Sequence, residues 1–191
     1  MSRRRLGWVL AGLGLVVAIR LWMGAPLSVH TRGMLPQVQP GDVVWVYFGA
    51  PQVGDVVSAR MAPDEPLQLA RVVAAQGQAV EASDGVLYVD GMPAAAGQTR
   101  RDVACEGPHI LQALERWQGQ DVWVLPGEAV PLTRVPAGHA WLQGDNRSEA
   151  GDSQRWGAVP VSQIEGVAVL LMWPSAECVG ARWSRFLNRI K

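Results

Sequence analysis

The chain is almost devoid of lysine and has no excess of charge of either sign. Sixteen of its 17 cationic residues are arginine, and the single lysine, Lys191, is the last residue. The 17 acidic residues balance the cations, so the net charge is zero. Because a nucleic-acid-binding surface needs a basic excess, we expect no nucleic-acid partner. Chemistry that needs a lysine amine is excluded from residues 1–190.

Cysteine is scarce as well. Cys105 and Cys178 are too few for a zinc cluster of four thiolates or a disulfide-dense scaffold, and we expect no metal and no cofactor. Outside a membrane the two thiols either form a disulfide or lie apart as small apolar side chains. His109 follows Cys105 by four residues, so a Cys–His nucleophile is conceivable, but the structural role is the better interpretation.

The N-terminus has the pattern of a membrane anchor. Three arginines precede an uncharged run over residues 6–19, and Arg20 and Trp22 follow. Residues 6–23 nearly suffice to span a bilayer if Arg20 reaches the far interface. The basic residues 1–5 then stay in the cytoplasm, and the rest lies outside. A cleaved signal peptide is the main alternative, although Met23 and Ala25 make a poor cleavage site; a buried soluble helix is the third.

The remainder, residues 24–180, has short segments rich in β-branched residues. Such segments at regular spacing predict a mainly β, antiparallel fold. Turn signals at residues 83–85 and 90–91 predict hairpins. Residues 91–138 are less regular and are expected to form an inserted lobe, with one helical hint at residues 110–117. The predicted strands cover residues 43–48, 55–60, 67–74, 86–89 and 167–173.

The tail, residues 181–191, alternates apolar and basic residues. Apolar side chains recur at helical spacing, with arginines on the opposite side. This predicts either an amphipathic segment on an anionic membrane surface or an ordinary element that covers the core. The residues are Trp183, Phe186, Leu187 and Ile190 on one side and Arg182, Arg185 and Arg189 on the other.

Three motif segments follow one another along the chain. The first is Thr31-Arg32-Gly33-Met34-Leu35-Pro36, followed by Gly41-Asp42. The second is Gly54-Asp55-Val56-Val57, followed by Leu69-Ala70-Arg71-Val72-Val73. The third contains Gly144-Asp145-Asn146-Arg147, Asp152-Ser153 and Trp156-Gly157, with Gly166 beyond it. The third segment is highly specific, and the first two gain weight from their order and spacing.

Together these segments resemble the type I signal peptidase family, membrane-anchored proteases that remove signal peptides from exported proteins. The resemblance covers the chain from the anchor to about Gly166. It implies a signal-peptidase-like antiparallel β-fold with an N-terminal transmembrane helix and an active site at the outer membrane surface. The family uses a serine nucleophile and a lysine base whose pKa is lowered by burial. A second serine orients the lysine, and a backbone N–H and an upstream hydroxyl form the oxyanion hole.

All three of those catalytic side chains are missing here. Gly33 stands at the nucleophile position, Ala70 at the base position and Ala150 at the position of the orienting serine. Loss of the nucleophile alone would leave a buried lysine without a partner, which is costly. Loss of all three leaves small apolar residues that need no partner. We therefore predict no cleavage by the family mechanism.

The rest of the motif framework is kept. Thr31 matches the upstream hydroxyl, and the backbone N–H of Gly33 can still face a carbonyl. The resemblance implies that Arg71 and Asp145 pair and brace two motifs. Gln154 stands where the family has an arginine partner for an aspartate, although Arg155 lies close by. The other retained motif residues are Met34, Pro36, Asn146, Arg147, Asp152 and Ser153.

A rebuilt nucleophile is the enzymatic alternative. Ser28, His30 and Thr31 are near Gly33 in sequence, and a hydroxyl activated by histidine is chemically reasonable. His139 is expected in the core or at the rim of the site. Asp64 and Glu65 lie between prolines and predict a turn. The aromatic residues Trp45, Tyr47 and Phe48 could rest on the bilayer surface.

We predict a single-pass protein of the cell membrane, with its main domain on the extracytoplasmic side. It would bind signal peptides or exported precursors without cutting them, or regulate an active signal peptidase or the export machinery. One alternative is an active signal peptidase that uses unusual residues. Another is a structural envelope domain that binds no peptide.

Overall fold

The computed structural model describes most of the chain after residue 23. The described residues are 24–103, 109–117, 119–125, 127–175 and 185–190, together with residues 8, 12, 14 and 15. Both cysteines lie outside them, as does most of the predicted anchor at residues 6–23. No helix within the described residues is long and apolar enough to cross a membrane. The anchor therefore stays a prediction.

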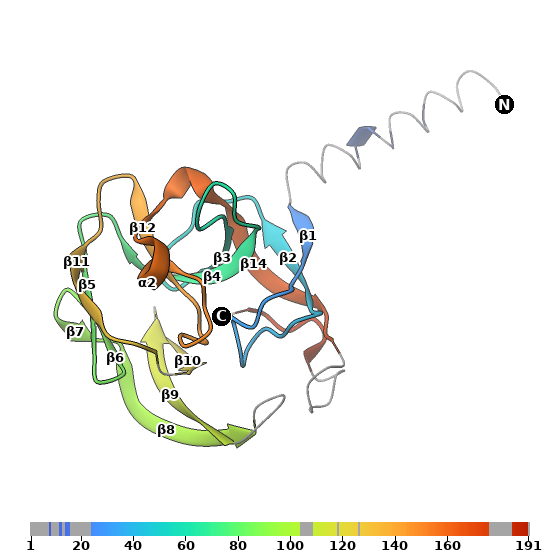
Figure 1. Cartoon of the computed structure of the whole chain (residues 1–191). Helices are drawn as coiled ribbons and strands as arrows, with labels where there is room; N and C mark the ends of the chain where they lie inside the picture. Colours follow the sequence, from blue (N-terminus) through green and yellow to red (C-terminus); the bar gives the residue numbers. More distant parts are fainter. Residues whose placement is uncertain are drawn as a thin grey trace.

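The described residues form three antiparallel sheets (Figure 1). The largest has seven strands in the order β1-β2-β14-β3-β4-β12-β13. Its strands are β1 (Ala25–Ser28), β2 (Val43–Tyr47), β3 (Val56–Ala59), β4 (Gln68–Ala75), β12 (His139–Gln143), β13 (Val159–Pro160) and β14 (Ile164–Trp173). A four-residue helix, α2 (Ser153–Trp156), and a 3-10 turn, η1 (Val161–Gln163), follow β12 and β13. The predicted mainly β, antiparallel fold is confirmed.

A second sheet contains the predicted hairpins. Its order is β11-β5-β6-β7, with β5 (Ala79–Ser83), β6 (Val86–Val89), β7 (Met92–Pro93) and β11 (Val130–Arg134). Both two-residue turns, Asp84-Gly85 and Asp90-Gly91, have positive φ at both residues. This is the backbone geometry that favours Asp-Gly in tight hairpins.

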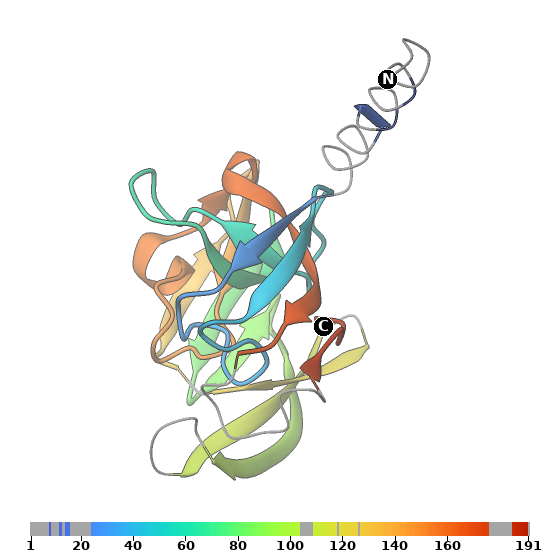
Figure 2. The ribbon, with the colours of Figure 1, turned by 90° about the vertical axis from the view of Figure 1, so that its right-hand side faces the viewer.

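The third sheet extends from the body as a curved ribbon (Figures 1 and 2). It has the order β10-β9-β8, with β8 (Ala95–Val103), β9 (His109–Trp117) and β10 (Gln120–Val124). The helix expected at residues 110–117 is wrong because this segment is β9, paired on both sides. The boundaries of the inserted lobe remain a prediction.

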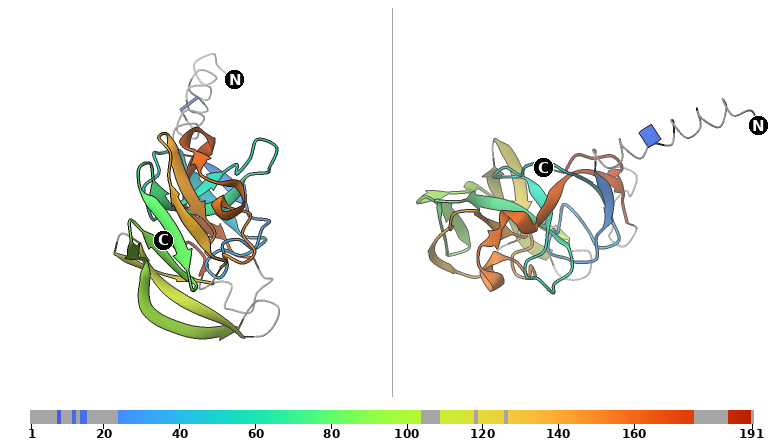
Figure 3. Two further views of the ribbon diagram at one scale, coloured as in Figure 1. Left: turned by 60° about the vertical axis from the view of Figure 1, so that its left-hand side comes forward. Right: turned by 90° about the horizontal axis from the view of Figure 1, so that it is seen from above.

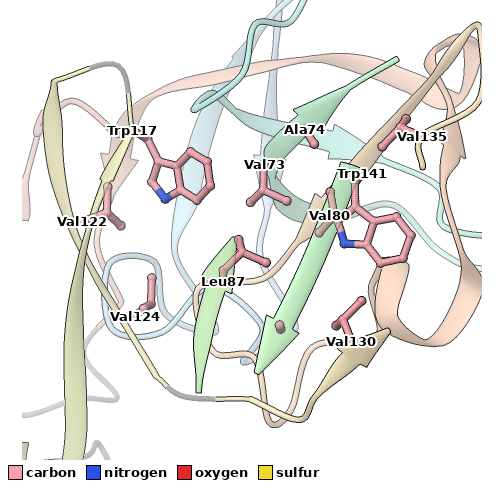
Figure 4. Packing of buried hydrophobic residues seen from close by; sticks show 11 residues of the cluster. Val73, Ala74, Val80, Leu87, Trp117, Val122, Val124, Val130, Val135 and Trp141 are labelled. Carbon is pink, nitrogen blue, oxygen red and sulfur yellow. The ribbon is translucent and has the colours of Figure 1, made fainter. Parts of the chain in front are cut away.

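Among the described residues, one of three buried apolar clusters lies between the large sheet and the second sheet. In the left view of Figure 3, β12 crosses the molecule beside the green hairpin β5–β6. Trp141 of β12 packs with Val80 and Leu87 of that hairpin, and Trp117 of β9 closes the other side of the cluster (Figure 4). Strand β4 supplies buried side chains on both faces, since its six central residues are all buried. The two sheets and the base of the ribbon are therefore joined by one continuous apolar cluster.

The described part of the tail, residues 185–190, forms a turn and an isolated bridge rather than a helix. The bridge joins Arg189 to Leu170 of β14, and Ile190 packs against the core. Leu187 has φ 57°, which interrupts any regular helix. These residues therefore cover the core, while the others of the predicted amphipathic segment lie outside the described residues.

Candidate functional site

Gly33, Gly144 and Ala150 meet at one point, although they come from opposite ends of the chain. The carbonyl of Gly33 accepts a hydrogen bond from the N–H of Asn146 at 2.9 Å. A Cβ added to Gly33 would lie 3.6 Å from Ala150 Cβ and 3.9 Å from Thr31 Oγ1, which is ordinary contact. A Cβ added to Gly144 would collide with the carbonyl oxygen of Gly33 and with Ala150 Cβ. The position of Gly33 can therefore hold a side chain, whereas that of Gly144 cannot.

Ala70 lies beside this point on strand β4. The register pairs Leu142 with Val72 and Gln143 with Arg71, and Ala70 is the next residue of β4, at the end of that pairing. Ala70 is 1% exposed. A nearby contact, from Gln68 Nε2 to the carbonyl of Gly151 at 3.0 Å, joins β4 to the end of the third motif. The structure thus brings Gly33 and Ala150 together, and it places Ala70 on the strand that pairs with β12 up to Gln143.

A buried ion pair supports the same strands from the other face of the sheet. Arg71 Nε and Nη2 donate to the two carboxylate oxygens of Asp145 at 2.8 and 2.7 Å. The two side chains are 1% and 2% exposed. Arg71 also donates to the Gly54 carbonyl at 2.7 Å and to Gln37 Oε1 at 3.1 Å. This arginine therefore links the second motif segment to the third and to Gln37, the residue that follows Pro36 of the first.

Asn146 holds the first motif against the third. Its backbone N–H donates to Gly33, and its side-chain Nδ2 donates to the carbonyl of Arg32 at 3.0 Å. Its own carbonyl accepts from the N–H of Ala150 at 3.0 Å. The backbone around Gly33 is thus held in place without the three lost side chains.

Asp152 organises the turn that follows. Its carboxylate accepts from the N–H of Gly144 at 2.8 Å and from the N–H of Gln154 at 2.9 Å, so it caps α2. Burial raises the pKa of Asp152 to about 6, against the two backbone hydrogen bonds and the charge of Arg147, which lower it. Arg155 instead lies 5.0 Å above the ring of Trp156. No ion pair to Asp152 is found in the described part of the chain, so Arg155 does not replace the family's arginine there.

The remaining retained motif residues are structural. Met34 is fully buried in the core, and the Leu35–Pro36 peptide bond is cis. Ser153 Oγ accepts from the N–H of Leu142 at 2.9 Å and is thereby used within the fold. Arg147 forms a buried ion pair with Glu115 of β9.

Within the described residues, no side-chain hydrogen bond joins the candidates for a rebuilt nucleophile, Ser28, His30 and Thr31, to one another. Ser28 ends β1 opposite Val43, and His30 is exposed. His139 Nδ1 contacts the carbonyl of Ala137 at 2.8 Å and is away from Gly33 in sequence and bonding. Asp64 lies in the exposed turn between β3 and β4, as predicted. No group of three or more potential metal ligands occurs among the described residues.

Sequence reasoning missed three positions that hold the site. Glu115 also accepts from Trp117 Nε1 at 3.1 Å, so it ties the third motif to the ribbon. Gln37 and Arg185 connect the first motif to the tail. Each acts across a long sequence separation, and none belongs to a recognisable motif, so no local signal could have revealed them.

Comparisons with known proteins identify the family. A family model described as signal peptidase, peptidase S26, matches residues 2–173, and the chain belongs to this family. It is 29% identical to the probable signal peptidase I-1 of Synechocystis sp., over 93% of this chain and 83% of that protein. It is 26% identical to thylakoidal processing peptidase 1 of Arabidopsis thaliana, over 84% of this chain and 45% of that protein. The membership predicted from the three motifs is confirmed.

A solved structure is also similar. Signal peptidase I of Enterococcus faecalis V583 is 24% identical, with a TM-score of 0.41, over 63% of this chain and 97% of that chain.

Proposed function

We propose that this chain binds the signal-peptide region of exported precursors at the outer membrane surface and does not cleave it. The proposal rests on which residues stand at the three positions that correspond to the family's catalytic side chains. Gly33, Ala70 and Ala150 occupy the positions where a serine, a lysine and a second serine are expected from the family resemblance. None of these residues offers a nucleophile or a base.

The backbone around the centre supports peptide binding. The N–H of Gly33 has no acceptor among the described residues, and Thr31 Oγ1 would lie 3.9 Å from a Cβ added to Gly33. Strand β1 is an edge of the large sheet, and β2 is its one partner among the described strands. An extended peptide can add to such an edge through main-chain hydrogen bonds, while a carbonyl accepts from the Gly33 N–H.

An anchor at residues 6–23 would hold this centre at the bilayer, with the N-terminus in the cytoplasm and the main domain outside. Strand β1 begins at Ala25, immediately after that segment, and Ala25 pairs with Val46. Tyr47 and Phe48 follow Val46 and are 47% and 45% exposed. Exposed aromatic rings next to the anchor suit the interfacial region of a membrane.

An active peptidase that uses other residues is the second candidate. It is favoured by the relatives, which are named as peptidases. Thr31, with Ser28 and His30 nearby in sequence, would then carry the reaction. A regulator of an active signal peptidase is compatible with the first proposal, since neither role needs a nucleophile or a base.

Site-specific crosslinking tests peptide binding directly. A photoreactive amino acid replaces Gln68, whose side chain lies next to Gly151, in the full-length protein in detergent micelles. A labelled synthetic signal peptide should crosslink there, and unlabelled signal peptide should compete. The matched control carries the same photoreactive residue at exposed Leu132, which is 70% exposed on β11. Equal crosslinking at both positions, or none at either, would contradict the proposal and favour a structural envelope domain.

A further inference from the structure

The C-terminal segment, residues 185–190, holds the loop that presents Gly33. We propose that this segment is a clamp, and that Arg185 is a positioning residue that keeps residues 34–42 in the conformation that binds peptide. The inference rests on the proposed function, because it concerns the same site.

The clamp closes on Asp42, which ends the first motif and is fully buried. Its carboxylate accepts from the N–H of Gln39 at 2.8 Å and from the N–H of Ser175 at 2.6 Å. Arg185 Nη2 donates to the same carboxylate at 2.6 Å. Arg185 is the cation of this ion pair and is 18% exposed in its side chain.

Arg185 also reaches the middle of the loop. Its Nη2 donates to the carbonyl of Gln37 at 3.1 Å. The side chain of the same glutamine accepts from Arg71, which is bound to Asp145. Gln37 is therefore held from one side by the tail and from the other by the arginine that links the motifs.

The rest of the segment is fixed to β14, beside the end of that strand (Figure 2). Strand β3 pairs with β14 only as far as Val167. Beyond Val167 the tail pairs with the edge of β14 that β3 no longer covers. The N–H of Leu187 donates to the Leu171 carbonyl, and the N–H of Leu171 donates to the Asn188 carbonyl, both at 2.9 Å. Ile190 packs against the apolar cluster that contains Met34 and Val38 of the loop. The tail thus bonds to the sheet and presses on the loop.

Loss of Arg185 would leave the charge of Asp42 buried with only backbone donors. A buried charge that loses its partner favours opening of the structure around it. Here the structure around it is the loop itself, and Gly33 lies at its start. The test compares Arg185→Gln with Arg189→Gln, because Arg189 is exposed and bonds to β14 through its backbone. Both variants remove one positive charge.

Two measurements on the full-length protein in micelles separate a clamp from general stabilisation. The first is hydrogen exchange of the amides of residues 33–42, with the β5–β6 hairpin as the distant reference. The second is the affinity for a labelled synthetic signal peptide. We expect Arg185→Gln to speed loop exchange and weaken peptide binding about tenfold each, equivalent to about 1.4 kcal/mol. Arg189→Gln should change neither, and Arg185→Lys should restore part of both, because lysine can pair with Asp42 but lacks the guanidinium fork.

Unchanged loop exchange and affinity in Arg185→Gln would overturn the inference. Exchange that rises equally in the β5–β6 hairpin would also overturn it, since the residue would then act on the whole fold. If the unmodified protein binds no signal peptide, the proposed function fails. Loop exchange in Arg185→Gln then still decides whether the clamp exists.

Discussion

Gly33 and Gly144 touch each other, yet one added methyl group should affect them in opposite ways. At Gly33 the nearest atoms to the new Cβ would be Ala150 Cβ at 3.6 Å, Ala150 Cα at 3.7 Å and Thr31 Oγ1 at 3.9 Å, all at ordinary contact distance. At Gly144 it would meet the carbonyl oxygen of Gly33, a backbone atom that the hydrogen bond from Asn146 holds in place. Gly33 is also not among the glycines with positive φ, so its backbone suits any L-residue.

The expected magnitudes follow from these contacts. Gly33→Ala should stabilise the protein by about 0.4–1 kcal/mol, because alanine lowers the conformational entropy of the unfolded chain. Gly144→Ala should destabilise it by about 1–3 kcal/mol, since a packed core must shift to admit the methyl group. Gly33→Ser should behave like Gly33→Ala, because the hydroxyl can point towards Thr31.

Urea unfolding followed by tryptophan fluorescence measures all three variants, and the nine tryptophans provide the signal. If Gly33→Ala and Gly33→Ser destabilise as much as Gly144→Ala, then Gly33 is required by the backbone. The reasoning would then be refuted, because the absence of a serine at this position would have a structural cause. The predicted result would mean that only chemistry was lost there.

Three further variants test the framework. Arg71→Met should cost about 3–5 kcal/mol in urea unfolding, because it leaves the Asp145 carboxylate buried and unpaired; a loss under about 1 kcal/mol would contradict this. Glu115→Gln should lower the free energy of unfolding, because it leaves the charge of Arg147 buried without its partner. The control is Asp121→Asn, which removes the partner of Arg116 from an exposed ion pair and should change the stability little. The pKa of Asp152 is raised in the folded protein to about 6 from 3.8, so the folded state binds its proton more tightly than the unfolded state does. The resulting stabilisation is fully present below about pH 4 and is lost as the pH rises through about 6. Asp152→Asn should remove this part of the pH dependence of the melting temperature, and an unchanged profile would contradict the assignment.

The elements predicted best are those whose residues decide their structure locally. The Asp84-Gly85 and Asp90-Gly91 turns need positive φ at both residues, and they form the predicted hairpins. The run at residues 43–48 became β2 because its alternate side chains are buried. The helix expected at residues 110–117 failed because the apolar spacing was ambiguous in a short segment, and pairing with β8 and β10 decided the outcome.

The sequence was sufficient to predict the centre of the site, but not the residues that support it. The motif spacing was sufficient to single out Gly33, Ala70 and Ala150. The contacts of Glu115 with Arg147 and of Arg185 with Asp42 join residues 32 and 143 positions apart. Such pairs depend on how the sheets pack, and a single sequence carries no local record of that packing.

The most direct test of the central claim is incubation of the purified full-length protein with a labelled precursor in lipid or detergent micelles. An active signal peptidase is the positive control, and Gly33→Ala is the matched variant of this chain. We predict that the protein binds the precursor and that no cut product appears with either form. A product cut at the signal site by the unmodified protein, absent when Thr31 is changed to alanine, would contradict the account and establish a peptidase with unusual residues.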